Sequence, residues 1–176
     1  MTSRAIAVLG LLAVLVVPAA ASGDALALLA ELPSSGSPGD LSPRRLEPGG
    51  PVFLVSVAAN AIETWPAGTI SEPVVSPGPG TAIRGFPAFG DFDGDGRIDV
   101  AVSVATGIQV LAGDGNGRFR AAIGIPDDGA RPLAAGDVDG DGRSDLIVGA
   151  LSPGGVVLRT FQSLGEFRFA PPRDTP

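Results

Sequence analysis

Two stretches of this chain are near copies. Residues 91–100 read Asp-Phe-Asp-Gly-Asp-Gly-Arg-Ile-Asp-Val, and residues 137–146 read Asp-Val-Asp-Gly-Asp-Gly-Arg-Ser-Asp-Leu. Four acids and two glycines therefore recur in register at an offset of 46 residues. A fainter copy without acids lies upstream, where Val55–Ala58 matches Val102–Ala105 at an offset of 47. Self-similarity at a fixed period of this size predicts a stacked or radial repeat architecture.

The segments between the acidic stretches have the pattern of short strands. From Ile98 to Ala105 every second residue is Ile or Val, which is the period of a strand. Asp114-Gly115-Asn116-Gly117 is typical of a hairpin turn, with Asp114 and Asn116 as turn residues. In the last copy we expect strands at 146–150, 156–161 and 166–170. No stretch after residue 50 has helical periodicity, so the pattern predicts an all-β fold with about four antiparallel strands in each repeat.

The composition narrows the chemistry that the chain can perform. Of its 176 residues none is Cys, His, Tyr or Lys. Structural zinc sites, thiolate catalysis, disulfides and a Ser-His-Asp relay are thereby excluded. The net charge is −7, and the two repeated stretches hold eight of the nineteen acids. This localised excess of negative charge indicates a bound cation and gives no support for nucleic-acid binding.

The N-terminus has the pattern of a secretory signal peptide. Arg4 precedes an apolar run over 5–17, and Ala19-Ala20-Ala21 supplies a small-residue cleavage site. We expect residues 1–21 to be removed and the protein to be secreted, extracellular or periplasmic, with no membrane span after cleavage. An uncleaved single-helix anchor is the alternative, although 13 residues is short for a membrane span.

The rest of the chain divides into two parts by composition. Residues 22–50 contain four prolines with Ser and Gly between them, which predicts a linker. Residues 51–176 are the repeat region, with repeats at about 51–90, 91–136 and 137–176. Trp65 and the phenylalanines beside strands, Phe86 among them, are expected in the core.

Each acidic stretch can wrap one cation. Ligands at every second position can surround an ion when glycines such as Gly94 and Gly96 let the backbone turn tightly. An all-oxygen shell of this kind suits Ca²⁺ better than Mg²⁺, so the sequence predicts two calcium sites. The first set of predicted ligands is Asp91, Asp93, Asp95, the carbonyl of Arg97, and Asp99. The second set is Asp137, Asp139, Asp141, the carbonyl of Arg143, and Asp145.

Two other interpretations of the acidic stretches remain. An EF-hand loop begins in the same way, but it needs a Glu at its twelfth position and helices on both sides. Here the twelfth positions are Val102 and Val148, and both flanks have strand patterns. The second alternative is a solvated turn without a cation.

Residues 89–102 and 136–148 resemble the FG-GAP/VCBS repeat family, and residues 110–119 are similar to that family's turn between third and fourth strands. The resemblance implies blades of a β-propeller, as in integrin α-subunit heads and several secreted lectins. It also implies that the acidic loop joins the first two strands of a blade and holds calcium. We therefore expect a partial β-propeller of about three four-stranded blades.

A closed propeller typically needs four to eight blades. Three explanations are open: the chain is a fragment, copies of the chain complete a ring as a homo-oligomer, or the blades form an open stack.

The function that these features favour is a non-enzymatic binding, adhesion or scaffold module with an unknown protein or glycan ligand. A carbohydrate-binding lectin is the first alternative. An extracellular hydrolase is the second, because paired acids can cleave glycosides.

Overall fold

The computed structural model describes residues 40–58, 60–67, 71–127 and 130–175. In this part the chain forms twelve strands and no helix. The predicted signal peptide at 1–21 and residues 22–39 of the predicted linker lie outside the described residues. No helix suited to crossing a membrane is present in the part of the chain described.

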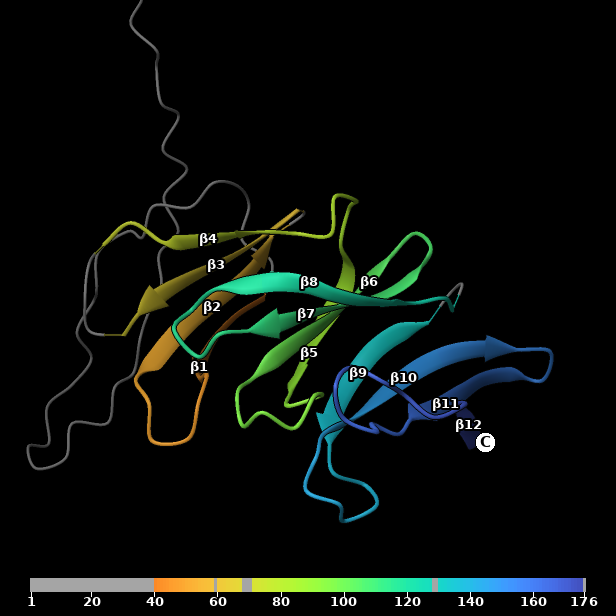
Figure 1. Cartoon of the computed structure of the whole chain (residues 1–176). Helices are drawn as coiled ribbons and strands as arrows, with labels where there is room; N and C mark the ends of the chain where they lie inside the picture. The colour runs from red at the N-terminus through yellow and green to blue at the C-terminus, as the bar shows by residue number, and fades with distance from the viewer. Residues whose placement is uncertain (1–39, 59, 68–70, 128–129, 176) are drawn as a thin grey trace, which may run out of the picture.

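The strands form three four-stranded sheets that lie side by side (Figure 1). The first sheet contains β1 (Asp40–Arg45), β2 (Val52–Ala58), β3 (Ala61–Pro66) and β4 (Val74–Pro77). The second sheet contains β5 (Arg84–Gly90), β6 (Asp99–Val104), β7 (Gly107–Gly113) and β8 (Phe119–Ile125). The third sheet contains β9 (Arg131–Gly136), β10 (Asp145–Ser152), β11 (Gly155–Phe161) and β12 (Arg173–Thr175). In each sheet neighbouring strands are antiparallel and follow one another in the chain, which confirms the predicted partial propeller.

The second sheet lies between the other two, and its strand β6 is buried along its whole length. Val100 and Val102 pack against the first sheet, in a cluster that contains Phe53 and Val55. Ala101 belongs to the other cluster, which joins the second sheet to the third. Successive side chains of a strand point to opposite faces. The alternation of Val with small residues in β6 therefore places larger side chains towards the first sheet and smaller ones towards the third.

Residues 40–50, predicted to be part of the linker, instead form strand β1 of the first sheet and most of the turn that leads to β2. Strand β1 pairs with β2 over its whole length. Leu46 after it is buried in the core, and the guanidinium of Arg44 lies 4.4 Å from the ring centre of Phe89 in the second sheet. The prolines misled the prediction because β1 is an edge strand, where a missing N–H costs no ladder hydrogen bond.

The alignment of residues 55–58 with residues 102–105, at an offset of 47, is shifted by one residue. It makes Val55 equivalent to Val102, yet these two side chains face each other across the interface between the first and second sheets. Equivalent residues in a stack of similar sheets point the same way. A shift of one residue reverses the face of every side chain in a strand.

Two further expectations are corrected. Residues 166–170 form no strand, because Glu166 and Phe167 have positive φ angles. The fourth strand of the third sheet is instead β12. Phe86 is 74% exposed on β5 and is not a core residue. Trp65, by contrast, is buried in β3 as expected.

Candidate metal centre

The two acidic loops occupy the same place in their sheets. One connects β5 to β6 and the other connects β9 to β10. Each therefore joins the first and second strands of its sheet, as the family resemblance implied. The first sheet has a short turn at this place, residues 46–51, in which Glu47 is the only acid.

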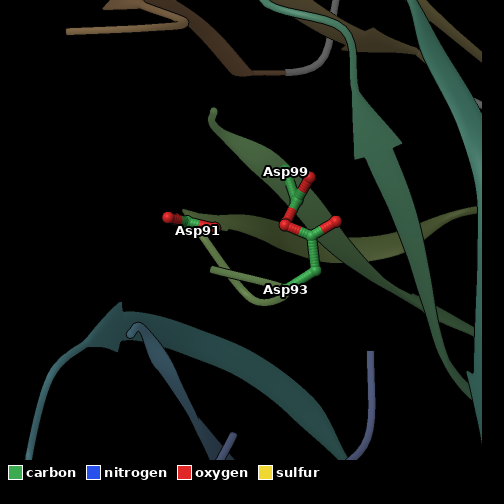
Figure 2. A group of neighbouring side chains, drawn as sticks. All are labelled: Asp91, Asp93 and Asp99. Carbon is green, nitrogen blue, oxygen red and sulfur yellow. The ribbon is translucent and has the colours of Figure 1, made fainter. Parts of the chain in front are cut away.

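In each loop three of the predicted ligands come together. Ligand oxygens of Asp91, Asp93 and Asp99 all lie within 4.8 Å of one another, and Figure 2 shows the carboxylates of Asp93 and Asp99 turned towards each other. The second loop brings Asp137, Asp139 and Asp145 together in the same way. These two groups occupy the first, third and ninth positions of the repeated stretch.

The first acid of each loop organises the backbone around it. Asp91 accepts hydrogen bonds from the N–H groups of Gly94 and Gly96, at 2.7 and 2.9 Å. Asp137 accepts the equivalent bonds from Gly140 and Gly142, at 2.6 and 2.9 Å. All four glycines have φ between 84° and 89°, a conformation that costs other residues energy. The glycines are therefore required by the turn itself.

The last acid of each loop is buried and holds the loop to the sheet. Asp99 is 1% exposed and accepts hydrogen bonds from the N–H groups of Phe92 and Gly113, both at 2.9 Å. Gly113 ends β7, so this carboxylate connects the loop to the third strand of its sheet. An ionised carboxylate has about four lone-pair sites. Asp99 thus keeps oxygen lone pairs that could serve a cation.

Asp145 has the corresponding role in the third sheet. It is completely buried and accepts hydrogen bonds from the N–H groups of Val138 and Ser163, at 3.0 and 2.8 Å. Asp99 and Asp145 are predicted from the sequence only as ligands, and their anchoring function is apparent only in the structure. Their position directly before an apolar strand was the available sign that they would be buried.

The acid at the fifth position of each loop, Asp95 or Asp141, pairs with the arginine two residues later. Asp95 forms an ion pair with Arg97 at 2.9 Å and accepts a hydrogen bond from its backbone N–H at 2.8 Å. Asp141 pairs with Arg143 in the same manner. Asp95 and Asp141 therefore lie outside the two carboxylate groups. That they, or the carbonyls of Arg97 and Arg143, bind a cation stays a prediction.

Burial and nearby negative charges raise the pKa of two carboxyl groups in the first loop. Burial raises the pKa of Asp99 to about 7, against the lowering effect of the Gly113 and Phe92 N–H groups, and the charges of Asp93 and Asp91 raise it further. Burial also raises the pKa of Asp93, and the charges of Asp95 and Asp91 add to this. In the second loop the hydrogen bond from Gly142 lowers the pKa of the exposed Asp137.

The donor set fits a hard divalent cation. Each group offers only carboxylate oxygens, and its carboxylates are too close to be ionised together without cost. A cation of charge +2 placed among them would remove that cost. Oxygen-rich flexible sites of this kind suit Ca²⁺, whereas the absence of nitrogen and sulfur donors makes them poor sites for Zn²⁺.

The two loops are also connected to each other. The N–H of Ser144, in the second loop, donates to the carbonyl of Asp91 at 2.8 Å, and the N–H of Asp91 donates to the Ser144 hydroxyl at 3.1 Å. Ser163 donates its hydroxyl to the carbonyl of Phe92 at 2.7 Å. Residues that flank strands of the third sheet therefore help to hold the first loop in place.

The surroundings of the loops differ. In the second loop Gln162 donates to the Asp139 carboxylate at 3.2 Å. The first loop borders a cavity of about 500 Å³ between the first and second sheets. Besides Asp93 and Asp95, the cavity is lined by Asp114 and by Arg118 and Arg120.

A family model named FG-GAP-like repeat matches residues 91–148. The match begins at the first acid of the first loop and ends within β10, so it contains both carboxylate groups. Residues 91–148 are thus similar to FG-GAP-like repeats. This confirms the family resemblance over the part of the chain that carries the two loops. Searches of curated proteins and of solved structures found no significant match to the chain.

The FG-GAP-like repeats and the sheets have different boundaries. The predicted repeats begin at residues 91 and 137, in the acidic loops, but the corresponding sheets begin one strand earlier, with β5 and β9. The hairpin at Asp114–Gly117 follows the prediction: the Asp114 carboxylate accepts hydrogen bonds from the N–H groups of Asn116 and Arg118, at 2.8 and 3.0 Å.

Proposed function

We propose that this chain is a secreted, non-enzymatic binding module whose propeller-like sheets are stabilised by two calcium ions. The observation that carries the proposal is the duplicated carboxylate group, with the same three positions and the same backbone hydrogen bonds in both FG-GAP-like repeats. One such group could form by chance in a turn. Two copies with matching geometry favour selection for a common ligand, and the donor chemistry favours calcium.

In this proposal the anchoring and ligand roles of the acids are combined. Asp91, Asp93 and Asp99 would hold the first ion, and Asp137, Asp139 and Asp145 the second. The ion would supply positive charge at the point where the loop meets two strands. Because Asp99 and Asp145 join loop to sheet, ion binding would stabilise the sheet as well as the loop.

A binding function is favoured over catalysis by the roles that these acids already have. A glycosidase needs one carboxyl group free to donate a proton and another free to act as base or nucleophile. In the loops, both oxygens of Asp99 and Asp91 accept backbone hydrogen bonds. The paired carboxylates are thus fixed as structural acceptors, which suits cation binding.

The signal-peptide pattern at 1–21 supports export of the protein. Extracellular modules typically bind calcium with Kd values of about 10⁻⁴–10⁻³ M. Sites of that affinity would be filled outside the cell, where calcium is abundant, and empty in the cytoplasm.

Isothermal titration calorimetry tests the calcium sites. The exported protein, as purified from a secreting host, is titrated with CaCl₂ to about 10 mM, ten times the weakest expected Kd. We expect two sites, loss of one with either Asp93→Ala or Asp139→Ala, and no binding with both. Asp174→Ala is the matched control, because Asp174 pairs with Arg159 away from the loops. Absence of calcium binding, or binding that survives the double substitution, refutes the proposal.

The cavity beside the first loop favours one second candidate, a lectin. Its lining of carboxylates and guanidiniums can both accept from and donate to sugar hydroxyls. A glycan array probed with the protein in calcium tests this. Glycan binding that is lost in the double variant Arg118→Ala, Arg120→Ala supports the lectin candidate. The absence of any bound glycan rejects that candidate.

A further inference from the structure

A series of buried hydrogen bonds connects the two carboxylate groups. Asp145, in the second group, accepts the N–H of Ser163 at 2.8 Å. The hydroxyl of Ser163 donates to the carbonyl of Phe92 at 2.7 Å. The N–H of Phe92 in turn donates to Asp99, in the first group, at 2.9 Å. We call these four residues the relay. Through it, only two residues separate a buried acid of one group from a buried acid of the other.

A second connection lies at Ser144, directly before Asp145 in the chain. Its N–H donates to the carbonyl of Asp91 at 2.8 Å, and its hydroxyl accepts the N–H of Asp91 at 3.1 Å. Asp91 belongs to the first carboxylate group. The first loop is thus bonded at its first acid to the neighbour of Asp145, and at its last acid to Asp145 itself through the relay.

The backbones of these segments are also in close contact. Gly90 ends β5 directly before the first loop, and a Cβ there would lie 2.6 Å from the Cβ of Ser144 and 2.8 Å from that of Ala135. A Cβ on Gly94, inside the first loop, would lie 3.3 Å from the side chain of Arg143. Because closely packed groups transmit displacements, a movement of the second loop would be felt by the first.

We propose that the two loops bind calcium cooperatively, with Ser163 as the positioning residue that couples them. This inference rests on the proposed function, because it takes both carboxylate groups as calcium sites. Without an ion, the crowded carboxylates of each group repel one another and oppose the ordering of their loop. With the second site filled, Asp145 is held in place, and Ser163 holds the Phe92 carbonyl of the first loop. The first site is then already ordered when its own ion binds, which raises its affinity.

The coupling acts equally in both directions. At equilibrium, the factor by which one bound ligand raises the affinity for another is reciprocal, and such factors are typically about 5–150. We therefore expect each filled site to raise the calcium affinity of the other by about fivefold or more.

Isothermal titration calorimetry of the exported protein with CaCl₂ measures this factor. Asp93→Ala leaves only the second site and Asp139→Ala only the first, and neither residue belongs to the relay. For independent sites, the product of the two wild-type association constants equals the product of the two single-site constants. We expect the wild-type product to be larger by about fivefold or more, and the ratio of the two products is the coupling factor.

Ser163→Ala tests the relay, since it removes the hydroxyl that donates to Phe92. The coupling factor, measured again in this background, should fall towards one. Ser103→Ala is the matched control: Ser103 is also completely buried, and its hydroxyl donates to the carbonyl of Ala130 at 3.0 Å, away from both loops. It should lower stability but leave the coupling factor unchanged. If Ser163→Ala fails to fold, Ser144→Ala removes only one partly buried hydrogen bond and should reduce the factor in part.

Amide hydrogen exchange gives a readout that does not depend on fitting two affinities. In the Asp93→Ala protein calcium binds only to the second loop, yet exchange of the Phe92 N–H in the first loop should become slower. Adding Ser163→Ala should remove this slowing while calcium still binds. A slowing caused only by general stabilisation of the protein would persist in the double variant.

Three outcomes overturn the proposal: a coupling factor of one in the wild type, a factor that Ser163→Ala leaves unchanged, or a factor that Ser103→Ala reduces equally. The proposed function fails separately. Two calcium sites that bind independently would overturn the coupling alone, whereas a chain that binds no calcium would overturn the proposed function as well.

Discussion

Substituting Asp99 should separate the anchoring role of an acidic-loop carboxylate from its role towards a cation. In chelator, Asp99→Ala removes the acceptor of two backbone N–H groups, those of Phe92 and Gly113. A buried donor left without a partner costs about 1–3 kcal/mol. The hydrogen bond from Phe92 is buried and the one from Gly113 is partly buried. We therefore expect the free energy of unfolding to fall by about 2–5 kcal/mol.

Asp93→Ala provides the comparison within the same loop. The Asp93 carboxylate accepts one exposed hydrogen bond, from the N–H of Asp95 at 3.0 Å, and it lies among other negative charges. Its removal in chelator should change the free energy of unfolding by less than about 1 kcal/mol. In calcium both variants should be less stable than the wild type, because each lacks a ligand of the first ion.

Urea unfolding at pH 6, below the folded pKa of Asp99 of about 7, measures these differences in chelator and in calcium. Asp145→Ala repeats the experiment in the third sheet, where the carboxylate accepts from the N–H groups of Val138 and Ser163. If Asp99→Ala fails to fold, Asp99→Asn retains one acceptor oxygen and should cost about half as much. Equal losses for Asp93→Ala and Asp99→Ala in chelator would refute the division of roles.

Three further predictions follow from the same contacts. In chelator, folded Asp99 holds a proton between its ordinary pKa of 3.8 and its folded pKa of about 7, so its contribution to stability should be lost as pH rises through 7. Calcium affinity should rise over the same range, because the ion competes with that proton. A calcium affinity that stays constant from pH 6 to 8 in calorimetry would contradict this. Gly140→Ala should lower the free energy of unfolding, measured by thermal unfolding, by about 1–2 kcal/mol, because φ is +84° there. The added methyl group itself meets nothing within 4 Å. Gly154→Ala is also in open space but has no positive φ, so it should leave stability unchanged. Ser163→Ala should cost about 1–3 kcal/mol, because the buried hydroxyl donates to the Phe92 carbonyl and accepts from Gly165, and it should also weaken the first calcium site.

The sequence predicted the parts of the fold that depend on local chemistry. Turn glycines and alternating strands have local causes, so the acidic loops, the hairpin at Asp114 and most strands of the second and third sheets were predicted. The duplicated motif gave the number of sheets because its period is the length of one sheet and its connection. Six of the ten predicted ligand residues come together in the structure.

The remaining features depend on contacts between distant segments. Strand β1 contains a proline and reads as linker, and only its pairing with β2 makes it a strand. Phe86 looks like a core residue, but its place on β5 leaves it exposed. The burial of Asp99 could not be deduced either, because its second hydrogen bond comes from Gly113, fourteen residues further along the chain.

Hydrogen bonds connect each acidic loop to segments of the neighbouring sheets, so the two loops and the three sheets are physically linked. Ile98, which ends the first loop, donates its N–H to the carbonyl of Leu46 in the first sheet at 2.8 Å. Ser144, which ends the second loop, donates in the same way to Asp91. Each acidic loop is therefore held by the sheet before it, and the first loop is also held by Ser163 from the sheet after it. An ion that orders one loop would thus fix the stacking of its neighbours, so calcium should stabilise the contacts between sheets and not only the loop that binds it.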